Sequence, residues 1–483
     1  MKGGVRRWPR ARLATQSVVC SLLLFTLSPG VPATAATSLE RLPSWVMTTG
    51  DGPHLADGPL AGAFVVTPGI ADRNCNRGVG TQLSLPSSWP PGPPYVSASM
   101  LPTGITLVAV SPGVTAPGAS TAPLVYALTK SCTPDTSFGA DGVEQLKLGS
   151  SGHAQQLSLA AMTPGLGGGV IVAGGFAGRW LVGRLDPNGH MDSTFGNDGW
   201  ATLPWRGSAS AVVQGPSGQV VVGGCTGPGC YSSSVSELSA LGTLEKSFGV
   251  GGLARVASIH DGALTHVAVG HGGEVFAVST GGNFGCWMTV VTALTPLGHP
   301  VPSFSRHFVQ GLKVVDPSAA SPWGVFDADL VVQPSGFALV GTEQPVCIGN
   351  TPNPSAAGRI ASFAPDGQLN AKFANNGVRS FTSQMMGEVW ALPTVKGGFV
   401  MVAGKPYFQT NSTKRAKLNI IAFLSDGKLD PSFGDAGRAQ VLLPYLNGAT
   451  STAPLSIAGN GKTIVIITWS TNSKALEVIQ LRV

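Results

Sequence analysis

A short motif built around phenylalanine returns at near-regular intervals through most of this 483-residue chain. In its clearest copies, residues 186–199 and 425–438, a turn rich in Asp, Pro and Gly precedes an Asp-x-Ser/Thr-Phe-Gly segment. Successive phenylalanines lie 53 to 69 residues apart, at Phe138, Phe195, Phe248, Phe304, Phe373 and Phe433. A period of this length is typical of solenoids, propellers and related arrays.

Between these motifs, short apolar runs alternate with glycine- and proline-rich turns, which predicts about four short strands in each period. One such period begins with predicted strands at residues 142–148 and 155–162. A buried run at residues 170–173 and a further strand at residues 180–185 follow, and these last two have counterparts in all seven units. Charged residues make up only 11% of the chain, beside 66 glycines and 37 prolines, which excludes long helices and general disorder. We predict an all-β fold, a β-propeller of seven four-stranded blades, with another β-repeat array such as a solenoid as the alternative.

The sequence allows two ways of closing the ring. The predicted strand at residues 475–481 ends the last unit and makes it complete or nearly complete. Residues 61–66 resemble one additional strand, which would pair beside that last strand or compete with it. In both readings, the N-terminal segment takes part in closing the ring.

The first 35 residues have the pattern of a secretory signal. An apolar run at residues 18–27 follows a basic segment, and small residues mark a cleavage site before Ala36. An uncleaved anchor is the alternative, but ten apolar residues are too few to span a bilayer. We therefore expect a signal peptide over residues 1–35, a leader segment over 36–59 and one propeller domain over 60–483. The protein should be secreted, extracellular or at the cell surface, and monomeric, with no membrane span in the mature chain.

The positive charge belongs largely to this leader. The net charge is +6, and five of the basic residues, Lys2, Arg6, Arg7, Arg10 and Arg12, precede the cleavage site, where no acid offsets them. The remaining chain is close to neutral, so we expect no nucleic-acid partner. The sequence contains no Gly-x-Ser-x-Gly, no phosphate-loop and no His-Glu-x-x-His motif, and we predict no cofactor, no metal and no catalytic residue.

Six cysteines remain after the signal, an even number in an oxidising compartment, so disulfides or free thiols are favoured over a metal site. The closely spaced cysteines 225 and 230 resemble half of a zinc site, but a second pair is missing. Their positions in the repeat predict the pairs Cys75–Cys132, Cys225–Cys230 and Cys286–Cys347.

The motif itself has two interpretations. Its acidic residues, Asp135, Asp192 and Asp430, supply oxygens that a calcium ion would accept. The same position holds Val301 in another copy, so we favour an Asx turn with the phenylalanine as a buried structural anchor. The histidines at 260, 266 and 271 are similarly read as scattered surface residues, because a strand separates the outer two by too great a distance for one metal.

The repeat resembles the bacterial delta-60 repeat, described as a β-propeller domain of unknown function, over roughly residues 60–483. The resemblance rests on copies such as residues 425–438, 186–199 and 365–377. It implies a secreted or surface propeller, and it supplies no catalytic residue and no ligand. The copy at Phe304 departs from the pattern, because Ser305 replaces the glycine.

We therefore expect an exported, non-catalytic propeller that serves as a binding or scaffold module for an unknown protein or carbohydrate ligand. Long connections at residues 111–123, 343–358 and 405–417 should share one face, where binding usually resides. The alternative is an extracellular hydrolase or lyase with its active site at the channel. Its sign would be a polar cluster at equivalent positions of neighbouring blades, and the strand pattern reveals none.

Overall fold

The structure is a computed structural model whose described part consists almost entirely of β-strands. It describes residues 65–66, 72, 75, 81–90, 94–112, 122–148, 157–227, 230, 232–256, 263–283, 286–301, 304, 324–333, 336–344, 358–381, 389–404, 417–442, 456–470 and 475–483. The chain divides into residues 1–44 and 45–483, and every described residue belongs to the second unit.

The strands form six hydrogen-bonded sheets of antiparallel neighbours. One sheet holds β3 (Tyr95–Met100), β4 (Thr106–Ser111), β5 (Leu124–Leu128) and β6 (Val143–Gln145). A seven-stranded sheet holds β7 (Leu157–Pro164), β8 (Val170–Phe176), β9 (Arg179–Leu185), β10 (Trp200–Gln214), β11 (Val220–Thr226), β12 (Ser232–Leu238) and β13 (Leu253–Arg255). A three-stranded sheet holds β14 (Ala263–Val269), β15 (Val275–Asn283) and β16 (Cys286–Leu294).

The remaining three sheets come from the C-terminal half of the chain and from two N-terminal strands. One holds β17 (Gly324–Gln333), β18 (Gly336–Gln344), β19 (Gly358–Phe363) and β20 (Val378–Phe381). Another holds β21 (Val389–Pro393), β22 (Phe399–Gly404), β23 (Lys417–Phe423), β24 (Arg438–Leu442) and β1 (Val65–Val66). The last holds β25 (Ser456–Gly459), β26 (Thr463–Ser470), β27 (Ala475–Arg482) and β2 (Thr81–Ser84).

Seven separate blades were expected, and the sheet count differs because β10 belongs to two repeat units. Its first half pairs with β9 and its second half with β11. A register shift between Thr202 and Arg206 and a positive φ of 127° at Gly207 bend the strand, so no turn is needed between the units. Seven repeat units therefore occupy six hydrogen-bonded sheets.

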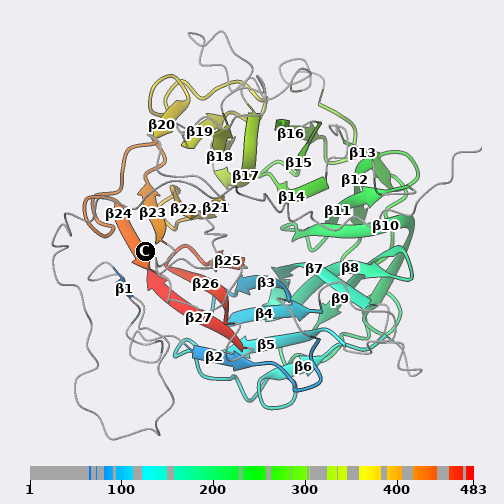
Figure 1. Ribbon diagram of the computed structural model, residues 1–483. Helices are drawn as coiled ribbons and strands as arrows, with labels where there is room; N and C mark the ends of the chain where they lie inside the picture. The colour runs from blue at the N-terminus through cyan, green and yellow to red at the C-terminus, as the bar shows by residue number, and fades with distance from the viewer. Residues whose placement is uncertain are drawn as a thin grey trace, which may run out of the picture. The chain divides into compact units, whose positions relative to one another are not determined.

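The first strands of the repeat units touch one another in a closed cycle. Following the chain, β3 contacts β7, β7 contacts β10, β10 contacts β14, β14 contacts β17, β17 contacts β21, β21 contacts β25, and β25 contacts β3. Figure 1 shows these strands around the middle of the unit, with the other strands of each sheet outside them. This is a β-propeller, so the predicted fold class is confirmed.

Apolar side chains between neighbouring sheets hold the ring together. In one cluster, Val402 and Ile420 of one sheet pack against Ile466 and Ile479 of the next, and all four side chains are at most 1% exposed. A single small sheet has no way to bury both of its faces, and stacking the sheets around a ring buries them. The clusters thus explain why the β-branched runs recur once in each period.

The strand after each motif belongs to the preceding sheet. Residues 142–148 were expected to begin a unit, but β6 pairs with β5 and forms the outer edge of the first sheet. The motif reverses the chain, since an isolated antiparallel bridge joins Ala140 to Val143, and the following strand then runs back along the strand before it. The motif is thus the turn between the third and fourth strands of a unit.

The ring closes through β2, which pairs with β27 and completes the last sheet. The sequence pointed to residues 61–66 for this role, and that assignment is wrong, because β1 pairs with β24 of another sheet. β1 holds only two residues, whereas β2 makes four pairs with β27 and buries Leu83.

Several contacts fix the N-terminal segment at this seam. Asp72 donates its backbone N–H to Gln480 and accepts from the Arg482 guanidinium at 3.0 Å. The hydroxyl of Thr81 donates to the carbonyl of Cys132 at 2.7 Å, and a disulfide joins Cys75 to Cys132. One short segment therefore bridges the first repeat unit and the last.

The recurring phenylalanine joins each unit to the following one. All six phenylalanines are at most 3% exposed. Five rings lie beneath the turn glycine of the next unit: Phe138 below Gly189, Phe195 below Gly242, Phe248 below Gly298, Phe304 below Gly367 and Phe373 below Gly427. A Cβ atom on Gly189 would lie 2.7 Å from the Phe138 ring, and its φ of +85° also favours glycine. The recurrence of the motif is explained by this contact, because each phenylalanine packs against the turn of the next unit.

Candidate functional site

One equivalent position on the first strands carries His266, Asp329 and two serines in different repeat units. The strand pairings define this position, which we call the inner row: Ser97, Ala161, Ala211, His266, Asp329, Trp390 and Ser456. Each member pairs with a buried residue of the second strand, for example His266 with Val278 and Asp329 with Val340. The inner row therefore compares equivalent places in the seven units.

Asp329 connects three of the first strands. Its Oδ2 accepts the backbone N–H of Ala391 in β21 at 2.7 Å, and its Oδ1 accepts the N–H of Leu330 in β17 at 2.7 Å. The same Oδ1 lies 3.1 Å from Nε2 of His266 in β14. A buried carboxylate requires such donors, because desolvation of an unpaired charge is costly. Asp329 is thus held in one geometry by its surroundings.

His266 is oriented by this carboxylate and remains partly accessible. Its side chain is 43% exposed, against 9% for Asp329. The contact with the carboxylate favours the tautomer that carries the proton on Nε2. Nδ1 is buried and has no hydrogen-bond partner in the part of the chain that the structure describes. The carboxylate therefore fixes the orientation of the imidazole.

Ser456 repeats the role of Asp329 at the seam of the ring. Its Oγ accepts the backbone N–H of Ala98 in β3 at 2.9 Å. Ala98 and Ala391 both come one residue after the inner row of their own strands, so the two contacts are equivalent. Inner-row oxygens thus tie the first strand of one unit to that of the next.

The polar members of the inner row and Trp390 together occupy five consecutive first strands. His266, Asp329, Trp390, Ser456 and Ser97 follow one another around the ring on β14, β17, β21, β25 and β3. The other two strands carry the small residues Ala161 and Ala211. Strands β7, β10 and β14 also have a register shift directly before the inner row, and such bulges re-aim side chains and are common beside binding sites.

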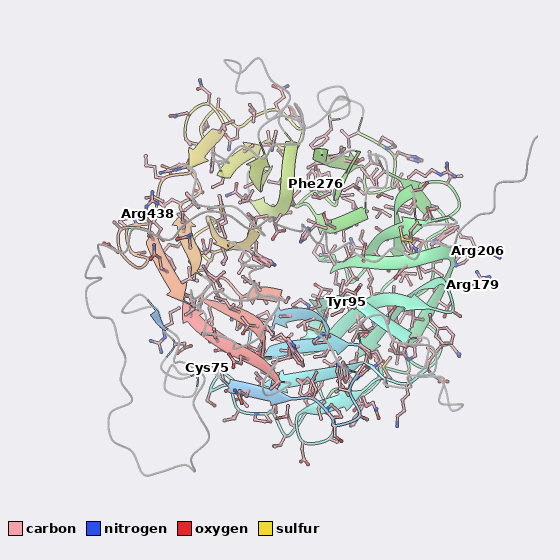
Figure 2. All side chains as sticks on the ribbon, in the orientation of Figure 1. Cys75, Tyr95, Arg179, Arg206, Phe276 and Arg438 are labelled. Atoms are coloured by element: carbon pink, nitrogen blue, oxygen red, sulfur yellow. A yellow bond between two sulfur atoms is a disulfide. The ribbon has the colours of Figure 1, made fainter. Side chains whose placement is uncertain are left out.

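Tyr95 stands on the same strand as Ser97, at the start of β3. Its side chain is 58% exposed, although tyrosine usually buries its ring. Figure 2 shows Tyr95 at the inner edge of the ring of strands, whereas Cys75 lies on the outer side. An accessible aromatic ring therefore lies on the same strand as an inner-row serine.

The motif aspartates form turns, as expected. Asp192 Oδ1 accepts both the N–H and the hydroxyl of Thr194, and Asp430 Oδ1 does the same with Ser432. The hydrogen bond from the Thr194 hydroxyl holds the pKa of Asp192 below its ordinary value. Among the described residues no group of three acidic, histidine or cysteine side chains is placed to hold a metal. These aspartates shape the backbone, and their oxygens are occupied.

The three histidines were interpreted as scattered surface residues. His260 lies outside the described residues, His271 is exposed in the turn after β14, and His266 is 43% exposed but contacts Asp329. A polar cluster at equivalent positions of neighbouring units was expected to mark a site, and the strand pattern did not reveal that His266 and Asp329 occupy such positions. Register shifts inside the first strands obscure the alternation that would have aligned His266 with Asp329.

Two of the three predicted disulfides are present. Cys75–Cys132 and Cys225–Cys230 are bonded, with Cα–Cα distances of 4.8 Å in both. Cys347 and the side chain of Cys286 lie outside the described residues, so this pair stays a prediction. The long connections at 111–123, 343–358 and 405–417 fall largely outside them too.

Known proteins offer similarity at the level of the fold. No protein-family model and no curated protein matches the sequence. Among solved structures, Drosophila Semaphorin 2a has 9% identity and a TM-score of 0.46, covering 83% of this chain and 75% of that one. A puromycin hydrolase has 15% identity and a TM-score of 0.41, covering 80% and 52%. The polysaccharide lyase Uly1 has 10% identity and a TM-score of 0.36, covering 62% and 74%.

Within the described residues, the structure has no helix of the length and apolar character that crossing a membrane requires.

Proposed function

We propose that the protein is exported and acts as a non-catalytic binding propeller whose ligand contacts the inner row. The observation that carries this proposal is the row itself, where four of the seven first strands carry a polar side chain: His266, Asp329, Ser456 and Ser97. Residues at such positions would ordinarily be small or apolar and serve only packing, as Ala161 and Ala211 do. A few polar groups that converge on one place in a rigid fold are characteristic of ligand sites.

Export is supported by the chemistry of the cysteines and the leader. Disulfides persist in oxidising compartments, and two are present in the described part of the chain. The basic and apolar segments of residues 1–35 have the composition of a secretory signal. The repeated motif supports membership of the delta-60 repeat family, whose implied fold is the same.

The binding role is tested by presenting the mature protein with two panels, one of extracellular proteins and one of polysaccharides, and measuring affinity and products together. Replacing His266 by alanine should weaken binding of the true ligand, whereas the same change at His190 should not. His190 is a matched control because its side chain is 65% exposed and lies in a turn away from the inner row. The ligand should be recovered chemically unchanged, and retention of full affinity by the H266A variant would overturn the proposal.

An enzyme is the second candidate, and one observation favours it. The 3.1 Å contact of His266 with Asp329 resembles the carboxylate–imidazole pairs that orient a general base. A product that forms with the wild type and disappears with the H266A variant would establish catalysis in place of binding.

A further inference from the structure

We propose that the ligand of the inner row is a neutral carbohydrate chain, which stacks on Tyr95 and hydrogen-bonds to Asp329 and the serines of the row. This inference rests on the proposed binding function and adds the chemical class of the ligand. It joins three properties of the site: an exposed aromatic ring, oriented oxygens and a row that contains neither lysine nor arginine.

Stacking requires an accessible aromatic face. Tyr95 is the one exposed large apolar side chain among the described residues that lies in a strand; the others, such as Leu241 and Val395, lie in turns, in a short 3-10 helix or at an isolated bridge. The C–H face of a sugar ring is apolar and weakly positive, so it complements the electron-rich face of an aromatic ring. Trp390 of the inner row, half-buried on β21, offers a second aromatic surface farther around the ring.

Sugar hydroxyls require donors and acceptors in fixed positions. A carboxylate has about four acceptor positions, and Asp329 uses three of them on Leu330, Ala391 and His266. The remaining position on Oδ2 is left for a hydroxyl of the ligand. Ser456 accepts from Ala98 and retains its own hydroxyl proton to donate. The backbone contacts hold both side chains in place before the ligand arrives, which lowers the entropy cost of binding.

The charge of the row selects against other ligand classes. It contains one carboxylate and neither lysine nor arginine. Phosphate, sulfate or uronate groups would meet the Asp329 carboxylate there, and the row offers neither lysine nor arginine to attract them. A neutral polyhydroxy ligand avoids this repulsion and still uses the hydrogen-bonding groups.

The depth of the row favours a thin ligand over a folded protein. The inner-row residues lie inside strands instead of in loops, and Asp329 is only 9% exposed. A protein surface would contact the loops first, whereas a single saccharide chain is narrower than a folded protein. Ala161 and Ala211, on β7 and β10, add only small side chains to the row.

The test is isothermal titration of the mature protein with cellohexaose, xylohexaose, mannohexaose, maltohexaose and chitohexaose. At least one should bind, and Tyr95→Ala should weaken that binding about tenfold, the loss expected for one aromatic stacking contact. Leu241→Ala is the matched control, because Leu241 is 61% exposed and sits in a turn after β12. Tyr95 is exposed, so its variant should keep the thermal unfolding midpoint of the wild type.

The outcomes separate this inference from the proposed function. Saccharide binding that Y95A weakens and L241A leaves intact supports the inference. Failure of all five hexasaccharides to bind, or binding that Y95A leaves unchanged, overturns it. If a protein or an anionic ligand instead binds in a manner that requires His266, the binding function survives and the carbohydrate assignment fails.

Discussion

Removing the disulfide between Cys75 and Cys132 should destabilise the protein more than removing the other described disulfide. Cys75 precedes β2, the strand that completes the last sheet, and Cys132 lies in the turn after β5 of the first unit. The bond therefore crosses the seam where the ring closes. Both cysteines are 1% exposed, so paired alanines are the substitution that leaves no buried polar group.

The expected magnitude follows from the lengths of the two closed loops. A disulfide stabilises chiefly by restricting the unfolded chain, in the loop-entropy description. The Cys75–Cys132 separation of 57 residues corresponds to about 4 kcal/mol. The Cys225–Cys230 separation of 5 residues corresponds to about 2 kcal/mol. The seam variant should therefore lose about 2 kcal/mol more than the control variant, before any loss from release of β2.

Guanidinium unfolding of the wild type, the C75A/C132A variant and the C225A/C230A variant measures both losses. Hydrogen exchange supplies a second readout, because release of β2 should expose the amides of β27 in the seam variant alone. Equal losses from the two variants, or unchanged exchange in β27, would refute the idea that this bond secures the closure of the ring.

Three further predictions concern the anchors, the seam and the leader. Replacing Phe433 by alanine should cost about 3–5 kcal/mol, because its ring is 2% exposed in the cluster between the last two sheets; an unchanged denaturant midpoint would contradict this. Burial raises the pKa of Glu477 above its ordinary 4.5, so the folded chain binds a proton that the unfolded chain has released, and stability should fall as pH rises from 4.5 through the raised value. Glu477→Gln should flatten that slope in unfolding experiments across this pH range, and a slope identical to the wild type would show that another group is responsible. Amino-terminal sequencing of the exported protein should find a start near Ala36, and an intact Met1 would refute cleavage.

The repeat made the fold class predictable, because its parts are local. Each motif needs its turn aspartate, its glycine and its phenylalanine within a few residues, and these stand together in the sequence. The point at which one unit ends and the next begins was harder to predict from the sequence. Residues 142–148 follow the motif in the chain, but antiparallel pairing returns them to the preceding sheet. Strand pairing of this kind depends on contacts that sequence order does not reveal.

The site was harder to predict than the fold, for a physical reason. His266 and Asp329 are 63 residues apart, and their contact exists only because β14 and β17 are neighbours in the ring. The shift between Leu264 and His266 moves the histidine out of the alternation by which a strand's two faces are recognised. The one available signal was a polar residue in an otherwise apolar first strand. Its equivalence to polar residues of other strands can be recognised only after the first strands are aligned by their pairing with the second strands.

Histidine NMR measures whether the ligand contacts the inner row, because His266 is a member of that row. The protein is labelled in its histidine rings and titrated with the ligand that binds it. The ring signals of His266 should move in proportion to saturation, while those of His190, 65% exposed near Glu144, should stay in place. A ligand that saturates the protein and shifts His190 or no histidine, with the His266 signals unmoved, would place binding elsewhere and contradict the account.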